Sequence, residues 1–237
     1  MTKKIVLSLA VVMFFACSGY CAPGRLYVMD TPTINILNYG SYGADFRMFS
    51  AGSVQTKLNF GVLKNLNIGV SWEVDNFIGN DQMQAAVPAL AVKVRLYDGN
   101  MTWPGIAVGY DGQGYFYIPN YDGDYMQKGR GIYVVVGREL FFQGLMIDAG
   151  LNMNDFSESR VFGFVNAVIP MYQEVLFFMA EYDNINYLPD ARLNLGIRYA
   201  LTDSIDLDFM VRDCWGKETL GKIPNERVFK ISYTGKF

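Results

Sequence analysis

The chain has 237 residues, a formal net charge of −3 and no histidine, and its residues are 51 % hydrophobic, 15 % aromatic and 18 % charged. The absence of histidine excludes Ser-His triads, histidine-ligated zinc and histidine acid–base pairs. A mildly acidic chain also lacks the basic surface that nucleic acid binding requires. The apolar composition, rich in Tyr, Phe and Gly, favours an antiparallel β protein.

The first residues have the pattern of a secretory signal peptide. Lys3 and Lys4 precede a nearly unbroken apolar run at residues 5–16, which is shorter than the ~20 residues that a membrane helix needs. Ala16-Cys17-Ser18 offers a small-x-small cleavage site, although Cys17 could instead be acylated, as in a lipoprotein. Either reading predicts export from the cytoplasm.

We expect three segments: a cleaved signal peptide at residues 1–22, a lead segment at residues 23–40, and one domain at residues 41–237. Cleavage removes two lysines and changes the formal charge from −3 to −5. Cys214 is the only cysteine of the predicted domain, so no disulfide framework stabilises it.

Apolar and polar residues alternate with period 2 along almost the whole domain, which predicts β-strands. In residues 66–74, for example, Leu66, Ile68, Val70, Trp72 and Val74 oppose Asn67, Gly69, Ser71 and Glu73. The facing of residues 131–137, 161–169 and 175–182 is ambiguous. About twelve strands are predicted, at residues 42–50, 54–62, 66–74, 90–96, 106–111, 131–137, 145–153, 161–169, 175–182, 191–199, 205–212 and 229–236.

The predicted connections alternate in length. Those on one side are short, such as the turns around Lys64 and Thr202, whereas those on the other side include long loops at 76–89, 112–130 and 214–226. The first outer turn, near Ala51, is a short exception. This alternation with an even strand count is typical of outer-membrane barrels.

A soluble barrel or sandwich has the same period with its apolar face turned inward. Three features favour a barrel in lipid: unusually ionic polar faces, aromatic residues near the ends of the apolar faces, and an amphipathic last strand ending in Phe237, a pattern that resembles the recognition signal of the barrel-assembly machinery. The aromatic residues are Tyr42, Phe60, Trp72, Tyr110, Tyr199 and Tyr233. The sequence therefore predicts an all-β, antiparallel transmembrane barrel with lipid around it.

The polar faces supply the candidate lumen-lining residues. Both signs of charge occur in nearly equal number, which favours salt bridges that fill a narrow barrel over a strongly ion-selective pore. Interior glycines such as Gly61, Gly109 and Gly150 leave room for the passage of small solutes. The candidate lumen residues are Asp45, Arg47, Lys57, Glu73, Lys93, Arg95, Asp148, Arg192, Arg198, Asp206, Asp208 and Arg212.

We predict no catalytic, cofactor or metal site. The glycines of residues 109–114 are followed by an extended-looking Tyr115-Phe116-Tyr117 instead of the helix that a phosphate site needs. Asn120, Asp122 and Asp124 have the spacing of a calcium loop, but Tyr125 stands where that loop requires glycine.

Several short segments resemble the YjbH-like proteins, a family of predicted outer-membrane barrels named after a protein linked to exopolysaccharide production. They are Asp30-Thr31-Pro32-Thr33, Tyr39-Gly40-Ser41-Tyr42, residues 104–112, residues 128–133 and Glu181-Tyr182-Asp183. The resemblance implies a barrel and a link to envelope polysaccharide, and it implies no catalytic residues.

The leading functional hypothesis is a non-enzymatic outer-membrane barrel, either a structural envelope protein or a small, narrow channel. Its expected partners are outer-membrane lipid, the assembly machinery and polysaccharide or small solutes. The first alternative is a soluble periplasmic β protein that binds a lipid or glycan. A weaker alternative is an outer-membrane hydrolase, whose acid–base partner would have to be Asp, Glu or Lys because histidine is absent.

Overall fold

The computed structural model describes residues 25–100, 102–118, 124–140, 144–154, 160–172, 175–216 and 223–237. The predicted signal peptide and its cleavage or acylation site lie outside these residues, as do Asn120 and Asp122 of the calcium-like spacing. Within the described residues, no helix is long and apolar enough to cross a membrane.

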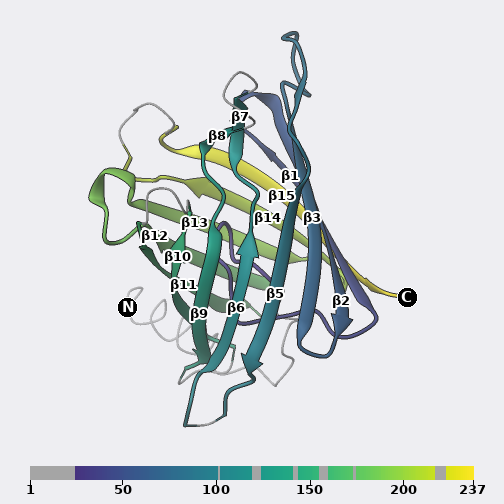
Figure 1. Ribbon diagram of the computed structural model, residues 1–237, viewed down its shortest axis with the longest axis vertical. Helices are drawn as coiled ribbons and strands as arrows, with labels where there is room; N and C mark the ends of the chain where they lie inside the picture. Colours follow the sequence, from purple (N-terminus) through teal and green to yellow (C-terminus); the bar gives the residue numbers. More distant parts are fainter. Residues whose placement is uncertain are drawn as a thin grey trace, which may run out of the picture.

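Twelve strands within the described residues form a closed antiparallel barrel (Figure 1). Strands that follow one another around the wall are paired, and β1 pairs with β15 to close the sheet, with Ser41 opposite Lys236 and Met48 opposite Phe229. The barrel strands are β1 (Ser41–Phe49), β2 (Ser53–Leu63), β3 (Leu66–Asp75), β5 (Ala89–Tyr97), β6 (Gly105–Asp111), β9 (Gly131–Glu139), β10 (Met146–Met153), β11 (Phe162–Tyr172), β12 (Leu176–Asp183), β13 (Arg192–Ala200), β14 (Ile205–Arg212) and β15 (Glu226–Lys236).

The predicted fold class is confirmed, and each predicted strand corresponds to one strand of the barrel. The remaining elements lie in the connections: β4 (Gln84–Ala85) pairs with β3, and β7 (Tyr115–Ile118) pairs with β8 (Asp124–Gln127) as a separate hairpin. Two short 3₁₀ turns, η1 (Ser50–Gly52) and η2 (Leu188–Asp190), complete the list.

The two ends of the barrel differ in their connections. One end, the turn end, carries short connections such as that between β2 and β3, and the backbone amide of Phe237 there donates to the carbonyl of Gly40 at 3.0 Å. The other end, the loop end, carries the long connections after β3, β6 and β14 and the short η1 turn. In outer-membrane barrels the short turns face the periplasm and the long loops face outward.

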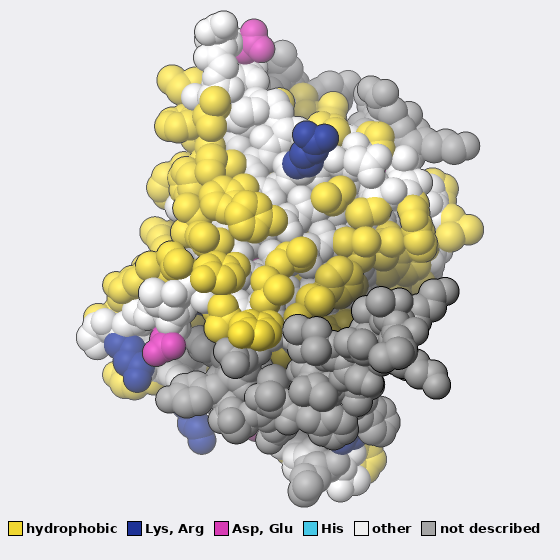
Figure 2. Space-filling view, turned by 180° about the vertical axis from the view of Figure 1, so that it is seen from behind, with side chains coloured by type: hydrophobic (Ala, Val, Ile, Leu, Met, Phe, Trp, Pro, Cys, Tyr) yellow, Lys and Arg dark blue, Asp and Glu magenta, His cyan; other side chains and the backbone are white. Residues whose placement is uncertain are grey.

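The outer surface is apolar. Every second residue of a strand points outward. In β9, Ile132, Val134 and Val136 expose their side chains, whereas Tyr133 and Val135 between them are buried. Figure 2 shows hydrophobic side chains gathered over the middle of the barrel wall, with charged groups mostly toward its ends. A soluble barrel would bury this face, so the surface matches a protein surrounded by lipid.

Candidate functional site

Residues 25–40, here called the plug, run into the barrel from the turn end and fold back to it. The limbs join at the Tyr27–Pro32 bridge. The backbone amide of Val28 donates to the carbonyl of Thr31 at 3.0 Å, which closes the turn around Asp30. In Figure 1 the purple trace of this segment passes behind the front wall of the barrel. Eight strands give an interior that side chains alone can fill; this larger barrel is filled by a piece of chain.

Glu181 of β12 holds the turn of the plug. Its carboxylate accepts hydrogen bonds from the backbone amides of Met29, Asp30 and Thr31 at 3.0–3.2 Å and from the Thr31 hydroxyl at 2.8 Å. The Asn194 side chain of β13 donates to the same carboxylate at 2.6 Å. Glu181 is 1 % exposed, so a ring of donors satisfies a carboxylate that water does not reach.

Other wall residues bind the two limbs of the plug. The Lys93 ammonium donates to the carbonyl of Leu26 at 3.1 Å, and the Arg198 guanidinium donates to the carbonyl of Val28 at 3.3 Å. On the returning limb, the backbone amide of Ile34 donates to the Asp148 carboxylate at 3.0 Å. These contacts satisfy backbone groups that the plug, having no sheet partner, would otherwise leave unpaired inside the barrel.

The Asp30 side chain occupies a carboxylate site at the tip of the plug. Its oxygens lie 2.7 Å from Nη1 of Arg47 and 2.7 Å from Nε of Arg212, and the Tyr115 hydroxyl donates to it at 2.9 Å. Burial raises the pKa of Asp30, but Arg212, Arg47 and these hydrogen bonds outweigh it and hold the pKa well below its ordinary range. Asp30 is therefore ionised at neutral pH.

The hairpin β7–β8 enters the barrel from the opposite, loop end. Tyr115 is buried between the two arginines, with its ring centroid 4.8 Å from the guanidinium carbon of Arg47 and 4.3 Å from that of Arg212. The backbone amide of Phe116 donates to Glu73 at 2.6 Å, and that of Tyr117 donates to Asp75 at 3.0 Å. The hairpin and the plug therefore meet at Asp30.

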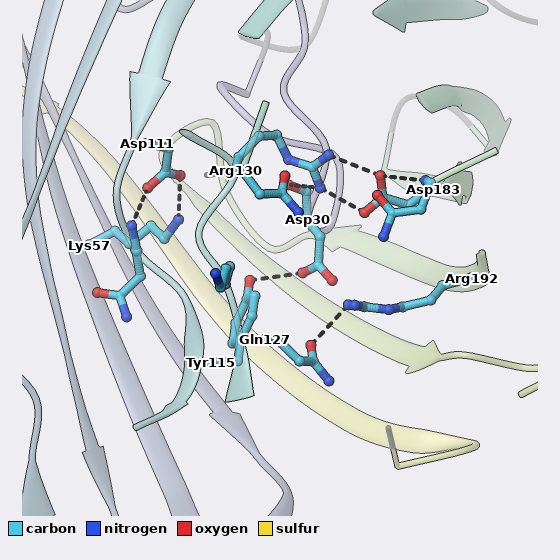
Figure 3. Close-up of a pocket in the computed structure, with 12 residues that line it drawn as sticks. Asp30, Lys57, Asp111, Tyr115, Gln127, Arg130, Asp183 and Arg192 are labelled. Atoms are coloured by element: carbon cyan, nitrogen blue, oxygen red, sulfur yellow. Dashed lines mark hydrogen bonds and ion pairs between the residues drawn. The ribbon is translucent and has the colours of Figure 1, made fainter. Parts of the chain in front are cut away.

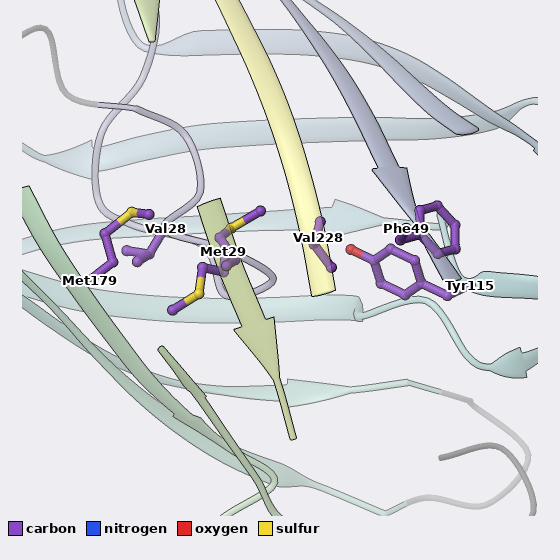
Figure 4. Close-up of a cluster of buried hydrophobic side chains, with 7 residues drawn as sticks. Val28, Met29, Phe49, Tyr115, Met179 and Val228 are labelled. Carbon is purple, nitrogen blue, oxygen red and sulfur yellow. The ribbon is translucent and has the colours of Figure 1, made fainter. Parts of the chain in front are cut away.

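The apolar core of the protein lies inside the barrel and includes plug residues. Val28 and Met29 pack with Tyr115 of the hairpin and with wall residues Phe49, Met179, Met210 and Val228 (Figure 4). A second cluster joins Ile34 to Ala107, Tyr133, Val135 and Phe164. The second cluster explains the ambiguous facing of residues 131–137 and 161–169, because the wall there is apolar toward both lipid and plug.

A small polar cavity of about 40 Å³ remains at the loop end, with Asp30 and Tyr115 among its lining residues (Figure 3). Two ion pairs flank it, Lys57–Asp111 at 2.9 Å and Arg130–Asp183 at 2.8 Å. Arg192 donates to Gln127 at 2.9 Å on the same rim. The cavity has room for a few water molecules, and around it the plug and the hairpin occupy the lumen of the described barrel.

The structure places the predicted lumen residues in four groups. Arg47, Lys93, Asp148, Arg198 and Arg212 contact the plug directly, and Asp206 binds the plug through Arg25. Asp208 lies beside them, bridging Arg198 and Lys230 at 2.8 and 2.9 Å. Glu73, Lys57 and Arg192 lie by the hairpin and the cavity. Arg95 is at the turn end, where it pairs with Asp98, and Asp45 is a half-buried neighbour of Lys57 across the β1–β2 pair.

The room left by the interior glycines is occupied. A Cβ atom on Gly61 would lie 2.0 Å from the carbonyl oxygen of Asn38 in the plug, and one on Gly109 would lie 2.4 Å from the Tyr133 hydroxyl. A Cβ on Gly150 would meet the ring of Phe164 at 2.3 Å. These glycines admit the plug and large inward side chains, so the room that they leave is filled in the described part of the chain.

The sequence reasoning missed the central residues of the site. It placed Asp30 in a lead segment outside the barrel and gave no role to Asp183, and it counted Glu181 among the inward charges without naming it as a candidate lumen residue. The available signals were the inward parity of Glu181 and the polar Asp30-Thr31-Pro32-Thr33 turn. Neither signal shows that the turn lies between Arg47 and Arg212, whose sequence separation is large.

These features define a transmembrane β-barrel with the architecture of outer-membrane barrels and an internal plug. No family model and no curated protein matches the sequence. Among solved structures, "KdgM porin in complex with disordered oligogalacturonate" has a TM-score of 0.53 at 8 % identity, over 83 % of this chain and 99 % of that one. The structure named "KdgM porin" gives a TM-score of 0.51 at 8 % identity over the same shares. Acinetobacter baumannii Omp33 gives 0.45 at 10 % identity, over 85 % of this chain and 99 % of that one. At these identities the likeness concerns the fold alone.

Proposed function

We propose that the protein is a non-enzymatic outer-membrane channel for small hydrophilic solutes and that the plug holds it closed in the conformation described here. The carrying observation is the charged wall of a twelve-stranded lumen that is filled by a separate segment of chain. The plug joins the wall covalently at β1 alone among the described residues, so it can leave without breaking any strand pair of the barrel.

The number of strands and the ion pairs between wall and plug support a removable plug. A barrel meant only as a scaffold can close its lumen with side chains at eight strands. Here the wall carries buried ionic groups whose partners lie on the plug, such as Arg47 with Asp30 and Asp206 with Arg25. Such groups return to water when the plug leaves, and they then line a hydrophilic passage.

Conductance across planar lipid bilayers tests this proposal. The wild-type protein should show rare openings, and Glu181→Ala should increase their frequency because the plug loses its main acceptor. Glu139→Ala, at an exposed position of the turn end, is the matched control. Silence of both wild type and Glu181→Ala at all voltages, with heat-modifiable migration retained, would overturn the channel function.

The second candidate is a permanently closed structural barrel, favoured by the small size of the residual cavity. A closed structural barrel predicts no conductance for either the wild type or Glu181→Ala. The link to envelope polysaccharide, which the resemblance to YjbH-like proteins implies, is also a proposal. It predicts that deletion of the gene lowers the amount of exported polysaccharide, and an unchanged amount would count against it.

A further inference from the structure

We propose that Arg47, Arg212 and Tyr115 form a carboxylate-binding site in the lumen, that Asp30 is its built-in ligand, and that a carboxylate-bearing solute such as a sugar acid replaces Asp30 when the channel opens. The last step rests on the proposed channel function. The site itself rests on the geometry around Asp30.

Two guanidinium groups and one hydroxyl converge on the Asp30 carboxylate at 2.7, 2.7 and 2.9 Å. The two carboxylate oxygens are divided between them, since Oδ1 accepts from Arg47 and Tyr115 and Oδ2 accepts from Arg212. Charge-assisted hydrogen bonds of this kind are the strong ones, and arginine is the residue best suited to recognise a carboxylate.

Arg47 depends on this carboxylate more than Arg212 does. Arg212 also pairs with Glu226 at 2.6 Å and donates to Gln127. For Arg47, Asp30 is the only acid that forms an ion pair with it in the described part of the chain, and its Nε and Nη2 atoms are buried without a partner. When Asp30 withdraws, Arg47 loses its only ion-pair partner in the described part of the chain and keeps unused donors, so an entering anion can take the place of Asp30.

The polar cavity lies on the loop-end side of this site. Asp30 and Tyr115 line it together with Lys57, Arg130 and Arg192 (Figure 3). Lys57 and Arg130 are each paired with an acid of the same lining, Asp111 and Asp183. A solute carboxylate at this rim approaches Asp30 from the side opposite the plug. The cavity is too small for a sugar while the plug is docked, so binding of the solute and departure of the Asp30 tip have to occur together.

Chemical rescue tests the site without requiring a conducting channel. Asp30→Ala leaves a carboxylate-sized vacancy, and amide hydrogen exchange of the plug peptide that contains Ile34 reports docking because that amide donates to Asp148. We expect exchange to rise about tenfold or more in the variant, in line with the loss of charged hydrogen bonds. Sodium acetate should reverse at least a third of that rise on a logarithmic scale, whereas acetamide and equal chloride should not.

Two further variants set the controls. Asp30→Ala combined with Arg47→Gln should lose the acetate effect, with heat-modifiable migration confirming the fold. Asp98→Ala leaves Arg95 unpaired at the turn end instead and should show no acetate effect on the Ile34 peptide. Equal rescue by acetamide or chloride, rescue that persists without Arg47, or no rescue would overturn the site.

The solute class is tested on the wild-type channel. Sodium glucuronate should raise the frequency of openings, whereas glucose with chloride at the same ionic strength should not. Equal effects of the two solutes would refute the choice of a carboxylate solute. A silent channel with intact acetate rescue would instead refute the channel function and leave the carboxylate site standing.

Discussion

The strongest prediction concerns Glu181, which binds the plug through four donors. Replacement by alanine removes the acceptor of three backbone amides and one hydroxyl inside the barrel. Each net hydrogen bond contributes about 1 kcal/mol, so the docked plug loses about 4 kcal/mol. Removing a buried carboxylate returns part of this, and we expect a net loss of about 3 kcal/mol.

Hydrogen exchange measures that loss directly. Because 1.4 kcal/mol is a factor of ten, the exchange of the plug peptide around Ile34 should accelerate about 100-fold in Glu181→Ala. Glu181→Gln keeps one acceptor oxygen and should give a smaller increase. Peptides of the β1–β15 seam should exchange as slowly as in the wild type. Unchanged exchange of the Ile34 peptide, with the barrel intact, would refute the assignment of Glu181 as the main anchor of the plug.

Three other predictions follow from the plug, the wall and the lipid face. Because the pKa of Asp30 is lowered on docking, its contribution is fully present above the ordinary pKa of about 3.9 and is lost only as pH falls through the docked value. The protection of a cysteine introduced into the plug, measured by its labelling rate, should therefore show no loss attributable to Asp30 between pH 7 and pH 5. In Asp30→Asn that protection should be weaker across the whole range. A loss of protection near pH 6 that is present in the wild type and absent in Asp30→Asn would contradict this. Gly61→Ala places a Cβ against the carbonyl of Asn38 in the plug and should speed exchange of residues 36–40, while equal exchange would show that this limb can shift freely. Leu151→Arg puts a charge on the exposed apolar face of β10 and should lower the free energy of unfolding from lipid vesicles by about 2–4 kcal/mol if the position is near the bilayer midplane, whereas a neutral result would argue against lipid contact there.

The barrel was predictable because its wall obeys one local rule. In β3 and β13, apolar residues such as Ile68 and Ile197 are exposed and polar ones such as Asn67 and Asn194 are buried. The period-2 pattern therefore predicts which side chains face outward. In β9 and β11 the rule fails, since Tyr133 and Phe164 face inward onto Ile34. Their facing depends on a plug residue about a hundred positions away, which no local pattern encodes.

The site was less predictable for the same reason. The inward parity of Arg47 and Arg212 follows from their strands, but their common partner Asp30 belongs to a segment without strand periodicity. Charge balance in the wall predicted filling by ion pairs. It did not show that some of those pairs, including Asp30 with Arg47 and Arg25 with Asp206, are formed with the plug.

The seam between β1 and β15 also sets the order of assembly. Ser41 pairs with Lys236, so the first and last strands meet only when nearly the entire chain has reached the membrane. Until then Glu181 and Arg212 lie on an open sheet, and the lumen that they line has not yet formed. The plug therefore finds its full set of partners late, and a barrel whose seam is still open exposes a charged inner face. Closure of one hydrogen-bonded seam both completes the wall and creates the binding site for the segment that precedes it.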